Sequence, residues 1–258
     1  MRLLERHNSG EYSLTKDFDR GHVPEYAILS HTWGPGSEEV TYRDLVDGTG
    51  ENKVGYEKIR FCGEQAARDG LQYIWVDTCC IDKSNGVELQ HSINSMFRWY
   101  RDSTKCYVFL TDVSVASNDA TGQCNQRLWE SALRSELRRS RWFERGWTLQ
   151  ELIAPHSVEF FSKDRDLLGN KKSLERYICE ITRIPSTALR GTPLATFSVA
   201  ERMSWTDTRK TTYEEDMVYS LLGIFDVYMP LIYGEGRDNA GERLREAIEN
   251  KHKGMLTL

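Results

Sequence analysis

The sequence lacks an apolar stretch that approaches the roughly 20 residues needed to cross a lipid bilayer. It also lacks a recognisable secretory leader ahead of its cysteines. Cysteine is sparse, at six residues, and the sequence has no C-x-x-C pair of the kind that ligates a metal. These absences predict a soluble protein of the reducing cytoplasm, without a membrane span or a metal site.

An excess of positive charge is missing too. The 34 Lys and Arg residues are outnumbered by 39 Asp and Glu, which gives a net charge of −5, and the basic residues are scattered among the acidic ones. Proteins that bind nucleic acids concentrate basic residues on one surface. We therefore expect no nucleic-acid partner.

No obvious linker divides the 258 residues, of which 39% are hydrophobic, enough for one large core. We expect a single domain over residues 1–258, with a core at about 23–165 and a helical extension at about 166–250. Residues 251–258 look like a cut end or an added tail.

Short apolar runs alternate with helical patterns in the first part of the chain. The expected strands are residues 26–30, 73–77, 106–110 and 158–162, and helices are expected between them at 55–70 and 88–100. Continuous apolar strands separated by single helices are typical of a parallel sheet with helices on both faces. The sequence thus predicts an α/β fold with a mostly helical C-terminal extension.

Weaker signals mark the remaining segments. Residues 3–4 and 12–14 suggest an opening hairpin, residues 114–126 a mobile excursion, and residues 229–236 a turn-rich return. Further helices are expected at 129–139, 172–181, 199–205, 214–225 and 239–250.

Polar side chains gather where the predicted strands end. Ligands of parallel sheets bind beyond the carboxyl ends of the strands, so a site is expected at this edge. The candidate residues are Ser30, His31, Trp33, Asp77, Cys79 and Asp82. Asp77 can hold a ligand hydroxyl or cap the next turn, and Ser30 and His31 can orient a ligand or serve the fold.

The stretch at residues 140–155, SRWFERGWTLQELIAP, is central to this expectation. Residues 147–153 lack a helix breaker and Pro155 forces a stop, so they predict a helix. Trp147 and Glu151 are four residues apart and hence neighbours on one face. An aromatic wall would desolvate Glu151 and raise its pKa; the alternative is that Glu151 merely pairs with an arginine.

Three segments resemble the fungal heterokaryon-incompatibility (HET) domain. They are YAILSHTWG at residues 26–34, YIWVDTCCID at 73–82 and RGWTLQE at 145–151. The segments at 221–225 and 233–236 look like the extension of members that precede a NACHT module and WD repeats. Together they cover nearly the whole chain.

HET domains have been likened to Toll/interleukin-receptor (TIR) domains, which implies a TIR-like (flavodoxin-like) sheet here. TIR domains that hydrolyse NAD use a glutamate in a Trp-x-x-x-Glu context, which Trp147 and Glu151 fit. The resemblance therefore implies a cell-death effector that forms a homo-oligomer and cleaves the nicotinamide glycosidic bond of NAD(P) through Glu151. NAD(P) would be the substrate, and no further cofactor is implied.

Several alternatives stay open. Trp147 can stack on a base or only pack, and Arg145 can bind a phosphate or pair with a carboxylate. Cys79 or Cys80 as nucleophile with His31 as base would make a Cys-His hydrolase. A zinc site formed by these residues and Asp82 is a weaker hypothesis, because adjacent cysteines rarely ligate one ion. A third alternative is a non-catalytic scaffold that self-associates and recruits partners.

Overall fold

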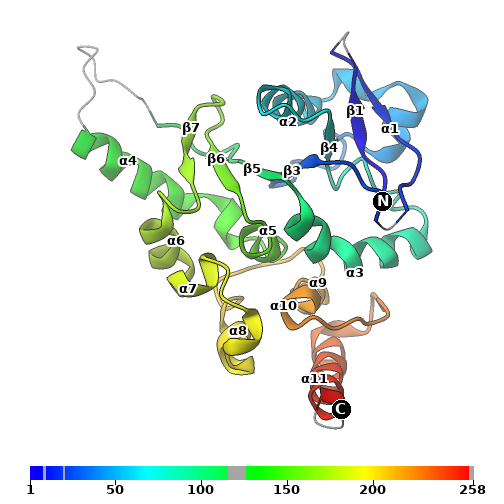
Figure 1. The fold of residues 1–258 in the computed structure, drawn as a ribbon, viewed down its shortest axis with the longest axis vertical. Helices are drawn as coiled ribbons and strands as arrows, with labels where there is room; N and C mark the ends of the chain where they lie inside the picture. The colour runs from blue at the N-terminus through cyan, green and yellow to red at the C-terminus, as the bar shows by residue number, and fades with distance from the viewer. Residues whose placement is uncertain (8–9, 20, 116–125, 256–258) are drawn as a thin grey trace.

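A seven-stranded sheet forms the centre of the computed structural model, which describes residues 1–7, 10–19, 21–115 and 126–255 (Figure 1). Its strands lie in the order β2-β1-β4-β3-β5-β6-β7. In chain order they are β1 (Leu4–Arg6), β2 (Tyr12–Leu14), β3 (Tyr26–His31), β4 (Tyr73–Trp75), β5 (Lys105–Phe109), β6 (Val158–Phe161) and β7 (Leu167–Asn170).

The four inner strands β4, β3, β5 and β6 are parallel, which confirms that part of the predicted sheet. In the register, Ile28 of β3 faces Trp75 of β4 on one side and Cys106 of β5 on the other. Every residue of β3 is buried, as expected for a strand with covered faces.

The three outer strands are antiparallel, so the sheet is mixed. The opening hairpin β1–β2 was predicted, but its pairing with β4 was not, and β7 was not predicted at all. The strand β7 follows β6 after a short connection, which permits antiparallel pairing, whereas β1 and β4 are far apart in the sequence and pair at the edge of the sheet. Arg165, in the turn between β6 and β7, has a left-handed backbone with φ of 70°.

Helices cover both faces of the sheet (Figure 1). The helix α2 (Tyr56–Arg68) lies on one face, and α3 (Gly86–Asp102) and α5 (Thr148–Ile153) lie on the other. The remaining α-helices are α1 (Tyr42–Asp47), α4 (Gln126–Arg139), α6 (Glu175–Thr182), α7 (Ser186–Leu189), α8 (Val199–Ser204), α9 (Asp216–Tyr219), α10 (Leu222–Phe225) and α11 (Gly236–Met255). Single 3-10 turns are η1 (Gly50–Asn52), η2 (Arg141–Glu144) and η3 (Leu194–Thr196).

The extension is mostly helical, as predicted, but its elements differ in detail. The single helix predicted at 214–225 is wrong, because α9 and α10 are separate. The break lies at Leu221, whose N–H donates to the carbonyl of Val218, three residues back, instead of continuing the α-helical ladder. The last helix, α11, is longer than predicted and includes residues 251–255.

Buried apolar residues of the extension, among them Trp205 and Leu222, belong to the same hydrophobic core as the sheet. The domain limits given above stay a prediction. Most of the predicted excursion, residues 116–125, lies outside the described residues.

Candidate active site

Glu151 lies on α5, a helix of six residues that are all buried. The sequence predicted this helix at residues 147–153. Its residues contact β3 of the sheet, α3 beside it and α7 of the extension, so it is enclosed from several sides. A carboxyl group in its middle is therefore removed from water, and only 7% of Glu151 is exposed.

A chain of hydrogen bonds holds the Glu151 carboxyl. The Ser30 hydroxyl, at the end of β3, donates to Glu151 Oε2, and the Trp142 indole Nε1 donates to Ser30 Oγ at 2.8 Å. The Tyr100 hydroxyl also hydrogen-bonds Glu151. The Tyr100 hydroxyl also lies 3.0 Å from the Leu29 carbonyl oxygen and donates to it.

Burial raises the pKa of Glu151 to about 8. The negative charge of Asp77 adds to this effect. The hydrogen bonds from Ser30 and Tyr100 and the positive charge of Arg209 act in the opposite direction without cancelling the effect of burial. The Glu151 carboxyl group is therefore largely neutral at pH 7.

Asp77 is the centre of a second polar cluster, next to the first along β3. Its carboxylate accepts hydrogen bonds from His31 Nε2 at 3.0 Å and from Trp33 Nε1 at 2.9 Å. Lys83 Nζ lies 3.8 Å from Asp77 and 3.6 Å from the centre of the Trp33 ring. Burial alone would raise the pKa of Asp77, but Lys83 and the two hydrogen bonds lower it to about 2.

The two clusters differ in their access to solvent. Trp33 is 45% exposed, whereas Ser30 is fully buried. His31 Nδ1 is buried and has no hydrogen-bond partner within the described part of the chain. The structure therefore brings together five of the predicted site residues, which are Ser30, His31, Trp33, Asp77 and Glu151.

The other predicted residues have partners elsewhere. The Asp82 carboxylate accepts hydrogen bonds from Ser84 in the loop before α3. Arg145 Nη1 donates to the Thr212 hydroxyl at 3.4 Å. Trp147 stands directly before α5, makes no side-chain capping bond to it, and hydrogen-bonds Asp216. The indole linked to Glu151 is thus Trp142, through Ser30.

Cys79 is fully buried, and burial raises the pKa of its thiol well above the usual value. A thiolate is the form of cysteine that acts as a nucleophile, so this environment works against a Cys-His hydrolase. Among the residues that the structure describes, no group of three or more His, Cys, Asp or Glu side chains could hold a metal ion.

Arg209 is a neighbour of Glu151 that the sequence did not indicate. Its buried guanidinium donates from Nη1 to the Arg145 carbonyl and to the Thr148 hydroxyl, both at 2.7 Å. Burial lowers its pKa to about 10. No local pattern could identify it, because it lies 58 residues beyond Glu151 in the sequence. Trp142, by contrast, lies in the stretch at 140–155 that the sequence singled out.

Glu151 does not line either of two hollows on the surface of the described residues. One of about 410 Å³ lies at the C-terminal end of α5, and one of about 820 Å³ lies between the start of α3 and residues 228–230. The expectation that Glu151 looks into a hollow above the sheet stays a prediction. None of the helices in the described residues is long and apolar enough to span a membrane.

Comparison with known proteins finds a match to the heterokaryon incompatibility family over part of the chain. Residues 26–151, from the start of β3 to Glu151 itself, match the family model of the heterokaryon incompatibility protein (HET). The chain is 61% identical over 256 residues to vegetative incompatibility protein HET-E-1 of Podospora anserina. That alignment covers 99% of the chain but 18% of the relative. No solved structure matches significantly, so the TIR-like assignment stays a prediction.

Proposed function

Because residues 26–151 belong to the HET family, we propose that the chain is a cell-death effector module of fungal non-self recognition that cleaves the nicotinamide glycosidic bond of NAD(P). The observation that carries the proposal is the buried Glu151 carboxyl, held by Ser30 at the carboxyl end of a parallel strand. The chain spans 18% of the length of its relative, which leaves room for an attached NACHT and WD-repeat sensor.

The proposed reaction needs little acid catalysis. The bond between ribose C1′ and the nicotinamide nitrogen breaks, and its electron pair goes to the nitrogen and neutralises the positive ring. The ribose becomes an oxocarbenium ion, which water captures with loss of a proton. One carboxylate placed beside the ribose can stabilise this cation. Glu151 takes that role, and Ser30 fixes its orientation.

The pKa of Glu151 gives this role a condition. A pKa of about 8 leaves most of the Glu151 carboxyl groups neutral at pH 7, whereas an oxocarbenium ion is stabilised by the ionised carboxylate. The cationic nicotinamide ring lowers the pKa of a carboxyl group beside it. Substrate binding therefore favours the ionised form of Glu151, and the rate of hydrolysis should rise as the pH increases towards 8.

Asp77 and Trp33 fit the same substrate. Asp77 stays ionised at neutral pH and can accept hydrogen bonds from ribose hydroxyls. Trp33 offers a half-exposed aromatic surface for stacking. Because Glu151 is almost enclosed, access requires a rearrangement. Clustering of the modules by an attached sensor would supply it, with one copy completing the site of its neighbour.

The test is nicotinamide release from NAD by the chain fused to an inducible dimeriser. Glu151→Gln should lower the rate at least about a hundredfold, since it removes the anion but keeps the shape. Glu144→Gln, at an exposed residue in the same stretch, is the matched control and should retain full activity. Hydrolysis that survives Glu151→Gln would remove this residue from the mechanism.

A non-catalytic scaffold is the second candidate. It is favoured by the hydrogen bonds that satisfy the Glu151 carboxyl and by the position of both hollows away from it. Under this alternative, induced expression kills cells without a fall in NAD, and Glu151→Gln remains toxic. Under the enzyme proposal, NAD falls before death and both effects disappear in the variant.

A further inference from the structure

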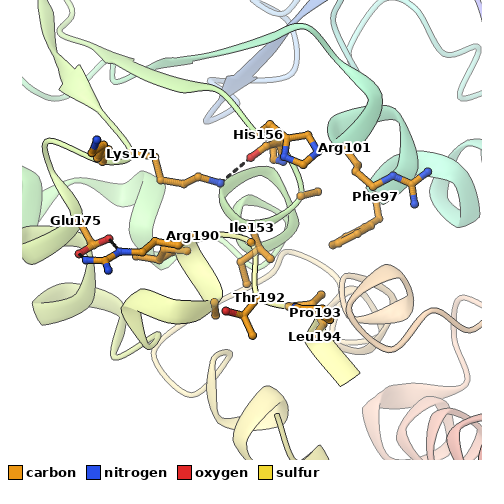
Figure 2. A pocket seen from close by; sticks show the side chains of 16 residues that line it. Phe97, Arg101, Ile153, His156, Lys171, Glu175, Arg190, Thr192, Pro193 and Leu194 are labelled. Atoms are coloured by element: carbon orange, nitrogen blue, oxygen red, sulfur yellow. Dashed lines mark hydrogen bonds and ion pairs between the residues drawn. The ribbon is translucent and has the colours of Figure 1, made fainter. Parts of the chain in front are cut away.

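The hollow at the C-terminal end of α5 has the features of a ligand site (Figure 2). It lies where the end of α5 meets α3, the start of α6 and the loop after α7, and its volume is about 410 Å³. Small-molecule sites in proteins measure about 300–1,000 Å³ and are mostly apolar with a few polar groups. We propose that this hollow binds a small organic anion with an apolar body, such as an aromatic or medium-chain carboxylate.

The apolar body is argued from the side chains that surround the hollow. Phe97 comes from α3, Ile153 from the end of α5, and Leu189, Pro193 and Leu194 from α7 and the segment after it. In Figure 2, Phe97, Ile153, Pro193 and Leu194 lie below Lys171, His156 and Arg101. An alkyl chain or an aromatic ring would remove this apolar surface from water.

The anion is argued from the balance of charge. Four basic side chains line the hollow, from Arg101, Lys171, Lys172 and Arg190, but one carboxylate, Glu175. Arg190 holds Glu175 through two bonds of 2.6 Å, so this pair neutralises itself. Arg101 pairs with Asp102 at 2.8 Å, so Lys171 and Lys172 are the two lining cations without a carboxylate partner in the described part of the chain, and they leave the hollow positive.

Lys171 supplies the most specific contact. Its Nζ donates to the Pro155 carbonyl at 2.6 Å and to the Leu152 carbonyl at 3.2 Å, and the dashed line in Figure 2 marks the bond to Pro155. An ammonium group has three donors, so one remains for a ligand. Within the described residues Lys171 forms no ion pair, and burial lowers its pKa to about 8. An anion in the hollow would supply the missing counter-charge.

The charged rim is also accessible. The Arg101 side chain is half-exposed, and Lys172 is exposed and forms no ion pair in the described part of the chain. His156, next to Pro155, lines the same rim. Because the site does not include Glu151, its occupancy can be measured without reference to the proposed hydrolysis.

The test is calorimetric titration of the whole chain with 1-naphthoate and octanoate, each compared with its neutral alcohol, 1-naphthalenemethanol or octanol. The carboxylates should saturate one site with a dissociation constant below about 1 mM, and the alcohols should bind at least about tenfold more weakly. Equal affinity for acid and alcohol, or no saturable binding of either acid, would overturn the proposal.

Charge reversal on the rim locates the site. Arg101→Glu combined with Lys172→Glu should weaken carboxylate binding at least about tenfold. Lys163→Glu, at an exposed lysine that does not line the hollow, controls for a charge reversal elsewhere on the surface and should leave the affinity unchanged. Circular dichroism establishes that each variant is folded. An equal loss in Lys163→Glu, or an unchanged affinity in the double variant, contradicts the assignment.

Discussion

Glu151 lies on α5 and Lys171 binds the carbonyls at the C-terminal end of that helix, and burial brings the two groups to nearly the same pKa from opposite directions. The pKa of Glu151 rises from 4.5 to about 8, and that of Lys171 falls from 10.5 to about 8. In each case desolvation disfavours the charged form, whatever its sign. Asp77 shows the other outcome, because Lys83, His31 and Trp33 compensate for its burial and its pKa falls to about 2. Partners, not depth alone, decide which group keeps its charge.

These two pKa shifts define two pH ranges in which the stability of the folded chain changes in opposite directions. Above pH 4.5 the unfolded chain releases the Glu151 proton while the folded chain keeps it, so stability falls until about pH 8. Between about pH 8 and 10.5 the folded chain releases the Lys171 proton while the unfolded chain keeps it, so stability rises.

The largest expected effect is the loss of the first slope in Glu151→Gln. The variant should gain stability over the natural chain by about 1.4 kcal/mol per pH unit between pH 5 and 8, because an amide does not ionise. Urea unfolding at unit steps of pH measures the difference. Glu144→Gln is the control, and an equal pH dependence in both variants would remove Glu151 as its source.

The second effect concerns the other end of α5. Lys171→Met should lack the stability that the natural chain gains between pH 8 and 10.5. The gain is expected to be about 1–3 kcal/mol, less than for Glu151 because Lys171 is only partly buried. Thermal unfolding at pH 8, 9 and 10 compares it with Lys163→Met. If the unfolding temperatures of the natural chain and Lys171→Met change with pH in the same way, Lys171 is not the source of the gain in stability.

Ser30→Ala sharpens the comparison by removing a partner instead of a charge. It leaves the Trp142 indole N–H and Glu151 Oε2 without their hydrogen bond to Ser30, at a cost of about 2 kcal/mol. The pKa of Glu151 should rise further, because that hydrogen bond lowers it. The pH profile of nicotinamide release should shift to higher pH. Ser84→Ala, in an exposed loop, is the control. An unshifted pH profile in Ser30→Ala would contradict the proposed effect of Ser30 on Glu151.

The smallest expected effect concerns the close contact between Gly146, just before α5, and Thr211 of the extension. An added methyl group at Gly146 would lie 2.4 Å from Cγ2 of Thr211, so Gly146→Ala should cost about 1 kcal/mol. Thr211→Ser removes that methyl group and should restore stability in the double variant. Urea midpoints of the two single variants and the double variant measure the coupling. A double variant no more stable than Gly146→Ala would show that the contact with the extension does not limit this position.

Local signals in the sequence predicted the inner sheet well. Continuous apolar runs with clear ends marked β3 and β5, and the helical spacing of residues 88–100 marked α3. Long-range features were not accessible in this way. The pairing of β1 with β4 and the added strand β7 depend on which edge stays free after the sheet has formed.

The candidate site was predicted in the same uneven way. Ser30, Asp77 and Glu151 were found from strand ends and one helix, because those positions follow from topology. The four-residue spacing suggested Trp147 as the partner indole, whereas the hydrogen-bond chain reaches Trp142. That link depends on where a 3-10 turn meets the end of β3, and spacing along one helix does not contain this information.

Arg209 determines how far a fragment of this protein must extend to keep the contacts of α5. The family match stops at residue 151, yet the carbonyl of Arg145 and the hydroxyl of Thr148 receive their hydrogen bonds from a side chain far downstream. A fragment trimmed to the matched residues would lose these bonds together with the indole of Trp205. A fusion protein that contains this domain should therefore extend past residue 209. Otherwise the segment that carries Glu151 loses the hydrogen bonds from Arg209.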